Sequence, residues 1–221
     1  MIVLGYDIKS DIPQNGMKRL GALATEKISP FSLNRTGTEL ADGIGVLIME
    51  SHNFAMKNNS FIYSTLVGYG VNSDAYNPTS PEPSGAALLK SMTDAIEMAN
   101  IKTNSIQYIN THGSGTKLND VLETNIIKNV FGMHAYNLFI NSSKSLIGHT
   151  LGASGIVELV ITIIQMQQKT IHPTANFTEP DPLCDLNYCF NKSITCQINY
   201  AISNSIGFGG INVCIILKNG V

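Results

Sequence analysis

Short apolar segments alternate with longer segments of helical periodicity along this 221-residue sequence, and that alternation restricts the fold more than any other feature. Strands that alternate with helices favour an α/β fold with a largely parallel, buried sheet. The final two strands are joined by a short glycine-rich segment and are candidates for a hairpin. We expect strands at residues 1–6, 45–50, 61–71, 106–110, 138–141, 200–205 and 212–217, the first of them buried, and helices at residues 17–24, 51–57, 85–100, 120–131 and 152–168.

The charge balance and composition exclude several classes of protein. Lys and Arg number 14 against 16 Asp and Glu, a formal net charge of −2, whereas a nucleic-acid surface needs excess basic charge. Hydrophobic residues make up 43% of the chain and charged residues only 14%, which is the opposite of the balance in disordered proteins. We therefore expect a deeply buried globular chain that binds no nucleic acid and hides part of its surface against partners.

The cysteines and apolar segments give no sign of metal binding, secretion or membrane insertion. No C-x-x-C pair and no zinc-like histidine spacing occurs among the cysteines, so buried free thiols are expected. No basic segment precedes the apolar run at Met1, and the longest apolar stretch, residues 156–166, is too short to span a membrane. These features predict a cytoplasmic protein. The cysteines are Cys184, Cys189, Cys196 and Cys214.

The first segment with candidate chemistry, residues 110–116, follows a predicted strand and precedes a predicted helix. Ligands of open α/β sheets bind at the carboxyl ends of strands, which is where His112 is placed. Two neighbouring glycines allow backbone to approach a ligand closely, and Ser114 and Thr116 add hydroxyl groups. A single histidine in such a position can equally be structural.

The second segment, residues 141–149, also follows a predicted strand and leads into the apolar helix at residues 152–168. It carries Lys144 and His149, and Glu158 lies inside that helix. A carboxylate among Ile, Val and Leu side chains is costly to bury without a partner, and Lys144 is the natural candidate. The alternative is that Glu158 faces water.

The third segment, residues 204–212, places Phe208 between glycines. A phenylalanine there can be a mobile plug or simply a turn residue. No helical pattern follows it, so the segment does not match the dinucleotide-binding fingerprint, and no other segment resembles a phosphate-binding P-loop.

Two histidines at strand ends, a lysine and a buried glutamate together suit one kind of reaction. Neutral imidazole N–H groups can polarise a carbonyl and stabilise the enolate that develops from it. This is the chemistry that decarboxylates an acyl group activated as a thioester.

Five ordered motifs, among them the T-H-G-S-G-T run at residues 111–116, resemble those of the β-ketoacyl synthases, the condensing enzymes of fatty-acid and polyketide synthesis. The resemblance implies a thiolase-like, layered αβαβα fold. Of that fold the chain would cover the end of the N-terminal half, residues 1–75, and the C-terminal half, residues 76–221. The motifs lie at residues 30–50, 111–123, 143–158, 173–182 and 204–212.

The resemblance implies catalytic roles for the residues of the first two segments. His112 and His149 would hydrogen-bond the thioester carbonyl of a malonyl group during its decarboxylation. Lys144 would pair with Glu158 and tune the environment of the histidines.

It also implies roles for residues that bind the substrate. Ser114 and Thr116 would contact the phosphopantetheine arm of an acyl carrier protein, which carries the substrate, and no other cofactor and no metal would be bound. Phe208, with Gly207 and Gly209, would form the gatekeeper and oxyanion site at the acyl pocket, and the Phe208 side chain would be the gatekeeper. The Phe208 backbone N–H would supply half of an oxyanion hole.

The family's nucleophile has no counterpart in this sequence. It is a cysteine at a helix N-terminus, where the helix dipole favours the thiolate, and family spacing would place it about twenty residues before Met1. None of the four cysteines can replace it. We therefore expect one subunit of a split synthase, in a hetero-oligomer with a chain that carries the N-terminal half and the cysteine, and no condensing activity alone.

Two other hypotheses stay open. Residues 36–40, T-G-T-E-L, stand where the family has D-G-F-V, and Ile206 replaces an aromatic residue; these departures point to a specialised polyketide branch or to relaxed selection. A non-catalytic scaffold, like the chain-length factors that pair with polyketide synthases, fits the departures, but the retained histidines argue against it. A truncated fragment without function would expose its first strand and aggregate.

Overall fold

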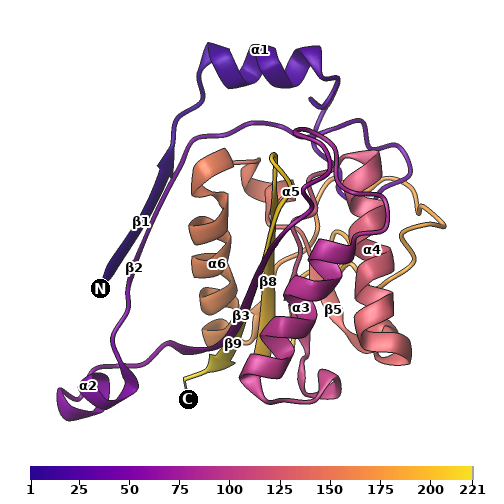
Figure 1. The fold of residues 1–221 in the computed structure, drawn as a ribbon. Coiled ribbons are helices and arrows are strands. Elements are labelled where there is room, and N and C mark those ends of the chain that lie inside the picture. Colours follow the sequence, from indigo (N-terminus) through magenta and orange to yellow (C-terminus); the bar gives the residue numbers. More distant parts are fainter. Residues whose placement is uncertain (221) are drawn as a thin grey trace.

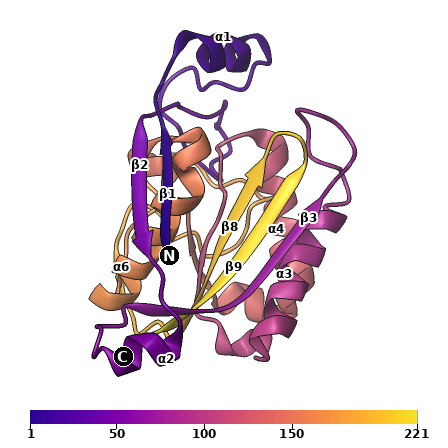
Figure 2. The same cartoon turned by 60° about the vertical axis from the view of Figure 1, so that its left-hand side comes forward.

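The computed structural model describes residues 1–220 as a layered, mixed α/β molecule. The layers are, in order, an antiparallel pair of strands (β1 and β2), helix α6, a five-stranded sheet, and helices α3 and α4 (Figure 1). A long connection, residues 8–42, joins the two strands of the pair, which is named the β1–β2 hairpin. Turning the molecule shows the hairpin lying over α6, with α3 and α4 on the far side of the sheet (Figure 2). Helix α6 therefore packs between two sheets and contacts both.

The elements agree in type with the predicted ones, and several short elements were not predicted. The strands are β1 (Ile2–Asp7), β2 (Gly43–Ile48), β3 (Ser64–Ser73), β4 (Tyr108–Asn110), β5 (Phe139–Asn141), β6 (Thr170–Ile171), β7 (Ile194–Thr195), β8 (Tyr200–Gly207) and β9 (Ile211–Asn219). The helices are α1 (Asp11–Arg19), α2 (His52–Lys57), α3 (Ala86–Ala99), α4 (Lys117–Phe131), α5 (Lys144–Ile147) and α6 (Ser154–Gln168), with short 3₁₀ turns η1 (Thr103–Ser105), η2 (Gly132–Asn137) and η3 (Leu151–Ala153). No helix within residues 1–220 has both the length and the apolar character needed to cross a membrane.

The five-stranded sheet is mixed, so the prediction of a largely parallel sheet was wrong. Its strand order is β3-β9-β8-β4-β5. Strand β4 runs parallel to β5 and β8, whereas β9 runs antiparallel to β8 and β3. The reason is the β8–β9 hairpin, which reverses the chain direction within the sheet. That hairpin itself was predicted and is confirmed.

The β1–β2 hairpin lies against α6 through one face only. Gly5 and Gly45 are cross-strand partners, and a Cβ on either glycine would lie within 2.8 Å of Ile156 Cγ2 on α6. The two glycines thus allow the helix to approach the strands closely. The prediction that the first strand is buried was wrong, because one face of the hairpin carries exposed apolar side chains: Ile2, Leu4, Tyr6, Ile44, Val46 and Ile48.

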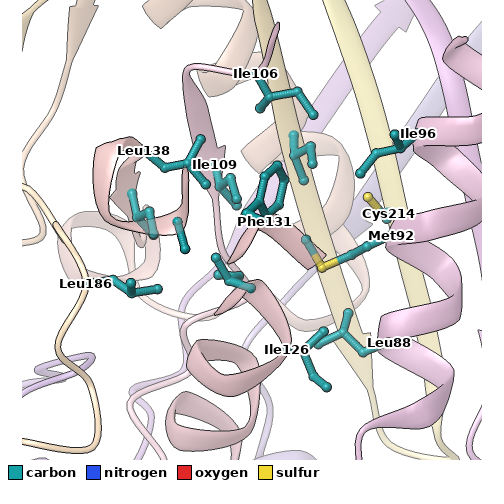
Figure 3. Close-up of a cluster of buried hydrophobic side chains, with 14 of the residues drawn as sticks. Leu88, Met92, Ile96, Ile106, Ile109, Ile126, Phe131, Leu138, Leu186 and Cys214 are labelled. Atoms are coloured by element: carbon teal, nitrogen blue, oxygen red, sulfur yellow. The ribbon is translucent and has the colours of Figure 1, made fainter. Parts of the chain in front are cut away.

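The main hydrophobic core lies between the five-stranded sheet and helices α3 and α4 (Figure 3). Met92 of α3, Ile109 of β4 and Phe131 of α4 are buried there with Cys214 of β9. Burial of each large apolar side chain contributes about 1.5–3 kcal/mol. This core fixes the positions of β4, β5 and β8, whose carboxyl ends carry the candidate site.

Helix α1 begins and ends earlier than the predicted helix at residues 17–24. Ser10 precedes its first turn and Pro13 lies within that turn, both of which favour a helix start. Gly21 follows the helix with φ +64°, and Leu23 then forms a parallel bridge with Thr38. Because of this pairing with a distant segment, the end of the predicted helix is extended rather than helical.

Candidate active site

A cavity of about 1280 Å³ brings together most of the candidate residues. Its walls come from α1, residues 77–81, the ends of β4 and β8, and the β8–β9 turn. His112, Ser114, Thr116, His149 and Phe208 all line it. Of the remaining candidates Gly207 lines it too, whereas Lys144, Glu158 and Gly209 are not among its lining residues.

The backbone around His112 fixes the orientation of its ring. His112 lies two residues after the end of β4, and its carbonyl accepts a 2.7 Å hydrogen bond from Lys144 Nζ. The N–H of Ile206 in β8 donates to His112 Nδ1 at 3.2 Å. Because Nδ1 is an acceptor, the hydrogen-bond network assigns the proton of the neutral ring to Nε2.

His149 is held in the same tautomer by a different set of contacts. Its backbone N–H donates to the Glu39 carbonyl at 2.6 Å. Its Nδ1 accepts from the Leu151 N–H at 3.2 Å and lies 2.9 Å from Ser154 Oγ. The rings of His112 and His149 are nearly perpendicular, with centroids 5.5 Å apart.

Both histidines are neutral at physiological pH. Burial lowers the pKa of His149 from its ordinary 6.5 to about 3, and the nearby Lys144 ammonium adds to the shift. Burial, Lys144 and His149 likewise hold the pKa of His112 well below its ordinary value. The site therefore presents two neutral N–H donors rather than imidazolium cations.

Lys144 and Glu158 form a buried ion pair behind the cavity wall. Lys144 Nζ lies 2.5 Å from Glu158 Oε1, and both side chains are almost completely buried. Asn110 donates to the other carboxylate oxygen at 3.2 Å. The alternative that Glu158 faces water is therefore excluded. Because Lys144 also binds the His112 carbonyl, the pair positions the loop that carries the imidazole.

The hydroxyls of Ser114 and Thr116 lie 3.0 Å apart. The backbone of their loop is hydrogen-bonded to helix α4. The N–H of Gly115 donates to Asp120 at 3.2 Å. Asp120 in turn lies 3.4 Å from Arg35 Nε, and both side chains are buried. Residues 30–35 and 111–116, which are distant in sequence, are thus joined through one carboxylate.

The β8–β9 turn presents Phe208 at the edge of the cavity. Its side chain is 53% exposed, and its backbone N–H makes no hydrogen bond to another residue of the described range 1–220. Gly209, which sequence reasoning grouped with the oxyanion hole, differs: its N–H donates to the Pro78 carbonyl at 2.8 Å. That bond uses the Gly209 N–H to hold the turn against residues 77–81, so this N–H is not free to bind an oxyanion.

Glu123 is a site residue to which sequence reasoning gave no role beyond its place in a motif. Its carboxylate accepts from the backbone N–H groups of His112 and Gly113, at 2.9 and 3.0 Å, and from Asn204 at 3.2 Å. Burial raises the pKa of Glu123 to about 7. The sequence feature that could have identified Glu123 is its position as an acidic residue near the start of the helix that follows the His112 loop. From there its carboxylate can reach the backbone of that loop.

No cysteine in the described part of the chain lines the cavity. Cys184, Cys189 and Cys214 are buried free thiols, as predicted, and Cys196 is partly buried. Burial raises the pKa of Cys184 and Cys189 to about 12, so these thiols are not nucleophilic at neutral pH. Within residues 1–220, no cluster of His, Cys, Asp and Glu could hold a metal ion.

The fold and the motifs agree with those of known condensing enzymes. Residues 63–178 match the family model for the "Beta-ketoacyl synthase, C-terminal domain", and the chain belongs to that family. It is 40% identical over 189 residues to 3-oxoacyl-[acyl-carrier-protein] synthase 2 of Synechocystis, and 39% identical over 189 residues to that of Staphylococcus aureus. These matches cover 86% of this chain but only 45% and 47% of the relatives. The chain thus spans about half their length.

Solved structures of ketosynthases share the arrangement over nearly the whole chain. A β-ketoacyl synthase from Burkholderia phymatum superposes with a TM-score of 0.94 at 32% identity, covering 99% of this chain and 54% of that one. A type II PKS acyl-carrier protein in complex with its ketosynthase gives 0.94 at 35% identity, covering 99% and 56%. The thiolase-like layered fold predicted from the motifs is therefore confirmed.

Proposed function

We propose that this chain supplies the decarboxylating half of a β-ketoacyl synthase centre, which condenses a carrier-bound malonyl group with an acyl group held on a cysteine outside these residues. The substrate would arrive on the phosphopantetheine of an acyl carrier protein, past Ser114 and Thr116. The division at residues 75 and 76 into parts of two synthase halves belongs to this proposal.

One observation carries the proposal: two neutral imidazoles line the same cavity with both Nδ1 atoms occupied as acceptors. Each ring can then only donate from Nε2. Two donors that converge on one carbonyl oxygen stabilise an enolate without any change of protonation. Rings fixed in the opposite tautomer would present a lone pair at Nε2 and could not do this.

The reaction follows from these donors. The thioester oxygen of the malonyl group accepts from His112 and His149, and the C–C bond to the carboxylate breaks to release CO₂. The electron pair of that bond forms the enolate, whose carbon then attacks the acyl thioester on the cysteine. The new C–C bond moves the π electrons of the attacked carbonyl onto its oxygen, and when they return the C–S bond breaks and the cysteine leaves as thiolate. The Phe208 N–H would stabilise the oxyanion at the attacked carbonyl.

The exposed face of the β1–β2 hairpin supports a partner polypeptide. Cross-strand pairs such as Leu4 with Val46 and Tyr6 with Ile44 place apolar side chains outward. A continuous apolar surface of this kind marks a protein interface. We assign it to the polypeptide that carries the cysteine, in a hetero-oligomer. Solved relatives include a ketosynthase in complex with its chain length factor.

Native mass spectrometry of this chain, co-expressed with the genes that flank its own, is the first test. We expect a complex with a cysteine-bearing partner, and CO₂ release from malonyl-pantetheine by that complex. His149→Ala should lower the release by about two to four orders of magnitude, whereas His52→Ala, at an exposed histidine in α2, should leave it unchanged.

Two results would contradict the proposal. Unchanged CO₂ release in the His149→Ala complex would reject the catalytic assignment. A complex with a full-length synthase, in which neither His112→Ala nor His149→Ala matters, would favour a non-catalytic scaffold like a chain-length factor.

A further inference from the structure

The hydroxyl of Ser154 contacts the ring of His149, and a neighbouring backbone group fixes the direction of that hydrogen bond. Ser154 Oγ lies 2.9 Å from His149 Nδ1, and the N–H of Leu151 donates to the same nitrogen at 3.2 Å. A backbone N–H can only donate, so Nδ1 carries no proton and must accept. The Ser154 hydroxyl therefore donates its proton to Nδ1, and its oxygen is left to accept from another donor.

A second hydroxyl lies within reach of the first. Thr150 Oγ1 lies 3.2 Å from Ser154 Oγ. Because the Ser154 proton is directed at the imidazole, the Thr150 hydroxyl is the donor in this contact. Thr150 is 2% exposed and Ser154 is 6% exposed, so little water competes for either group. The two hydroxyls and His149 Nδ1 thus form a chain of hydrogen bonds that all run in one direction, and such bonds polarise one another.

The backbone donor to the same nitrogen is in an unfavourable conformation. Leu151 has φ +45°, in the left-handed region that residues with a Cβ rarely adopt. Its N–H contact with Nδ1, at 3.2 Å, is at the long end of the range for hydrogen bonds. The Ser154 hydroxyl supplies the shorter of the two bonds, so its loss should change the environment of Nδ1 more than the loss of the other.

Both hydroxyls are placed by elements outside the segment that carries His149. A Cβ at Gly43 of β2 would lie 2.7 Å from both Cβ and Cγ2 of Thr150, so a larger residue there would have to displace the threonine. Ser154 is the first residue of α6. Side chains that are fixed by regular elements hold a neighbouring functional group more precisely than side chains on a free loop.

We propose that Ser154 is a positioning residue for decarboxylation: its hydroxyl, supported by Thr150, keeps the His149 ring in the tautomer and orientation that direct Nε2–H at the thioester oxygen. A donor at Nδ1 also withdraws electron density from the ring, which makes Nε2–H a stronger donor. The inference rests on the proposed condensing function. It adds to that site a residue to which the sequence motifs gave no role.

The kinetic test removes each hydroxyl in turn from this chain in the assembled complex. We expect Ser154→Ala to lower kcat for CO₂ release from malonyl-pantetheine by about three- to tenfold, the value of one neutral hydrogen bond. KM should stay within about twofold, because the bond matters most when charge develops on the thioester oxygen. Thr150→Val keeps the shape of the side chain and removes only the supporting donor, so kcat should fall less, by about two- to threefold.

A spectroscopic test separates positioning from a general loss of stability. Long-range ¹H–¹⁵N spectra of the full chain, labelled with ¹⁵N-histidine, show which ring nitrogen carries the proton, and His149→Gln identifies the His149 signals. Ser154→Ala should move the Nδ1 signal towards that of an acceptor nitrogen without a bond, and Thr150→Val should move it less in the same direction. Thr162→Val is the matched control. It removes a buried hydroxyl from the same helix, one that donates to the Glu158 carbonyl at 2.9 Å, and it should leave the Nδ1 signal and kcat unchanged.

Three results would overturn the inference: a His149 Nδ1 signal that Ser154→Ala does not move, a signal that moves while kcat stays unchanged, or an equal fall of kcat in Thr162→Val. The spectra do not depend on turnover. Absence of CO₂ release from the wild-type complex would instead reject the proposed function, and with it the catalytic role of Ser154, even where the Nδ1 signal moves as expected.

Discussion

The cavity wall and the outer face of the β1–β2 hairpin differ in whether their side chains find partners within this chain. At the wall, the Nδ1 atoms of His112 and His149 have partners within this chain, as does Lys144 behind it. On the outer face of the hairpin, apolar side chains such as Leu4 and Val46 are exposed. The difference teaches that the histidine geometry is preorganised by the chain itself, whereas the outer face of the hairpin has no partner within the described residues and is the surface that we propose for association.

The largest effect should come from the buried ion pair at the wall. Lys144→Met leaves Glu158 as an unpaired buried carboxylate, so we expect the free energy of unfolding to fall by about 3–5 kcal/mol. Urea denaturation followed by circular dichroism measures the change. The double variant Lys144→Met/Glu158→Leu should recover most of the loss. Lys90→Met, which breaks the exposed Lys90–Asp94 pair, should leave the midpoint unchanged; equal loss in both single variants would contradict the prediction.

A pH-dependent effect should follow from His149. Its pKa is depressed to about 3 in the folded chain, so its contribution to stability is present above about pH 6.5 and is lost as pH falls towards 3. Against His149→Gln, the wild type should lose about 2–3 kcal/mol between pH 7 and pH 4.5. The comparison must be made against the variant, because the raised pKa of Glu123, about 7, makes stability fall as pH rises from about 4.5 to 7. A difference that stays constant with pH would show that the ring is not held neutral.

A larger side chain on the inner face of the hairpin should destabilise the fold. In Gly45→Ala the new Cβ would lie 2.8 Å from Ile156 Cγ2, and we expect a loss of about 1–3 kcal/mol from overpacking. Thermal unfolding of Gly45→Ala against the wild type, and of Gly45→Ala/Ile156→Ala against Ile156→Ala, measures the effect with and without the Cγ2 methyl. If Gly45→Ala costs the same in both backgrounds, the contact with α6 is not the cause.

Substitutions on the outer face of the same strands should leave the stability of the fold nearly unchanged but should impair assembly with the partner. Leu4→Lys and Val46→Lys should alter the free energy of unfolding by no more than about 0.5 kcal/mol. They should weaken association with the cysteine-bearing partner by at least about tenfold, as read from titrations by native mass spectrometry. Unimpaired assembly in both variants would remove the hairpin from the proposed interface.

The sequence was sufficient to predict the features that depend on local pattern or on the energetic cost of burying a charge. The type of most elements follows from periodicity, and the Lys144–Glu158 contact follows from the cost of a carboxylate in an apolar helix. The mixed sheet did not follow, because the placement of β9 between β8 and β3 depends on tertiary packing. The same holds for the bond from Gly209 to Pro78, which joins segments far apart in the sequence.

Helix α6 contacts both the hairpin and the residues that hold the two histidines of the candidate site. Asp7 of β1 accepts the N–H of Gly152 at 2.9 Å, just before the helix begins, and Ser154 in its first turn contacts His149. Glu158, one turn further on, holds Lys144. A displacement of the hairpin by a few tenths of an ångström would therefore reach His149 within two contacts and His112 within three, so we expect occupation of the outer surface to change the alignment of the two N–H donors.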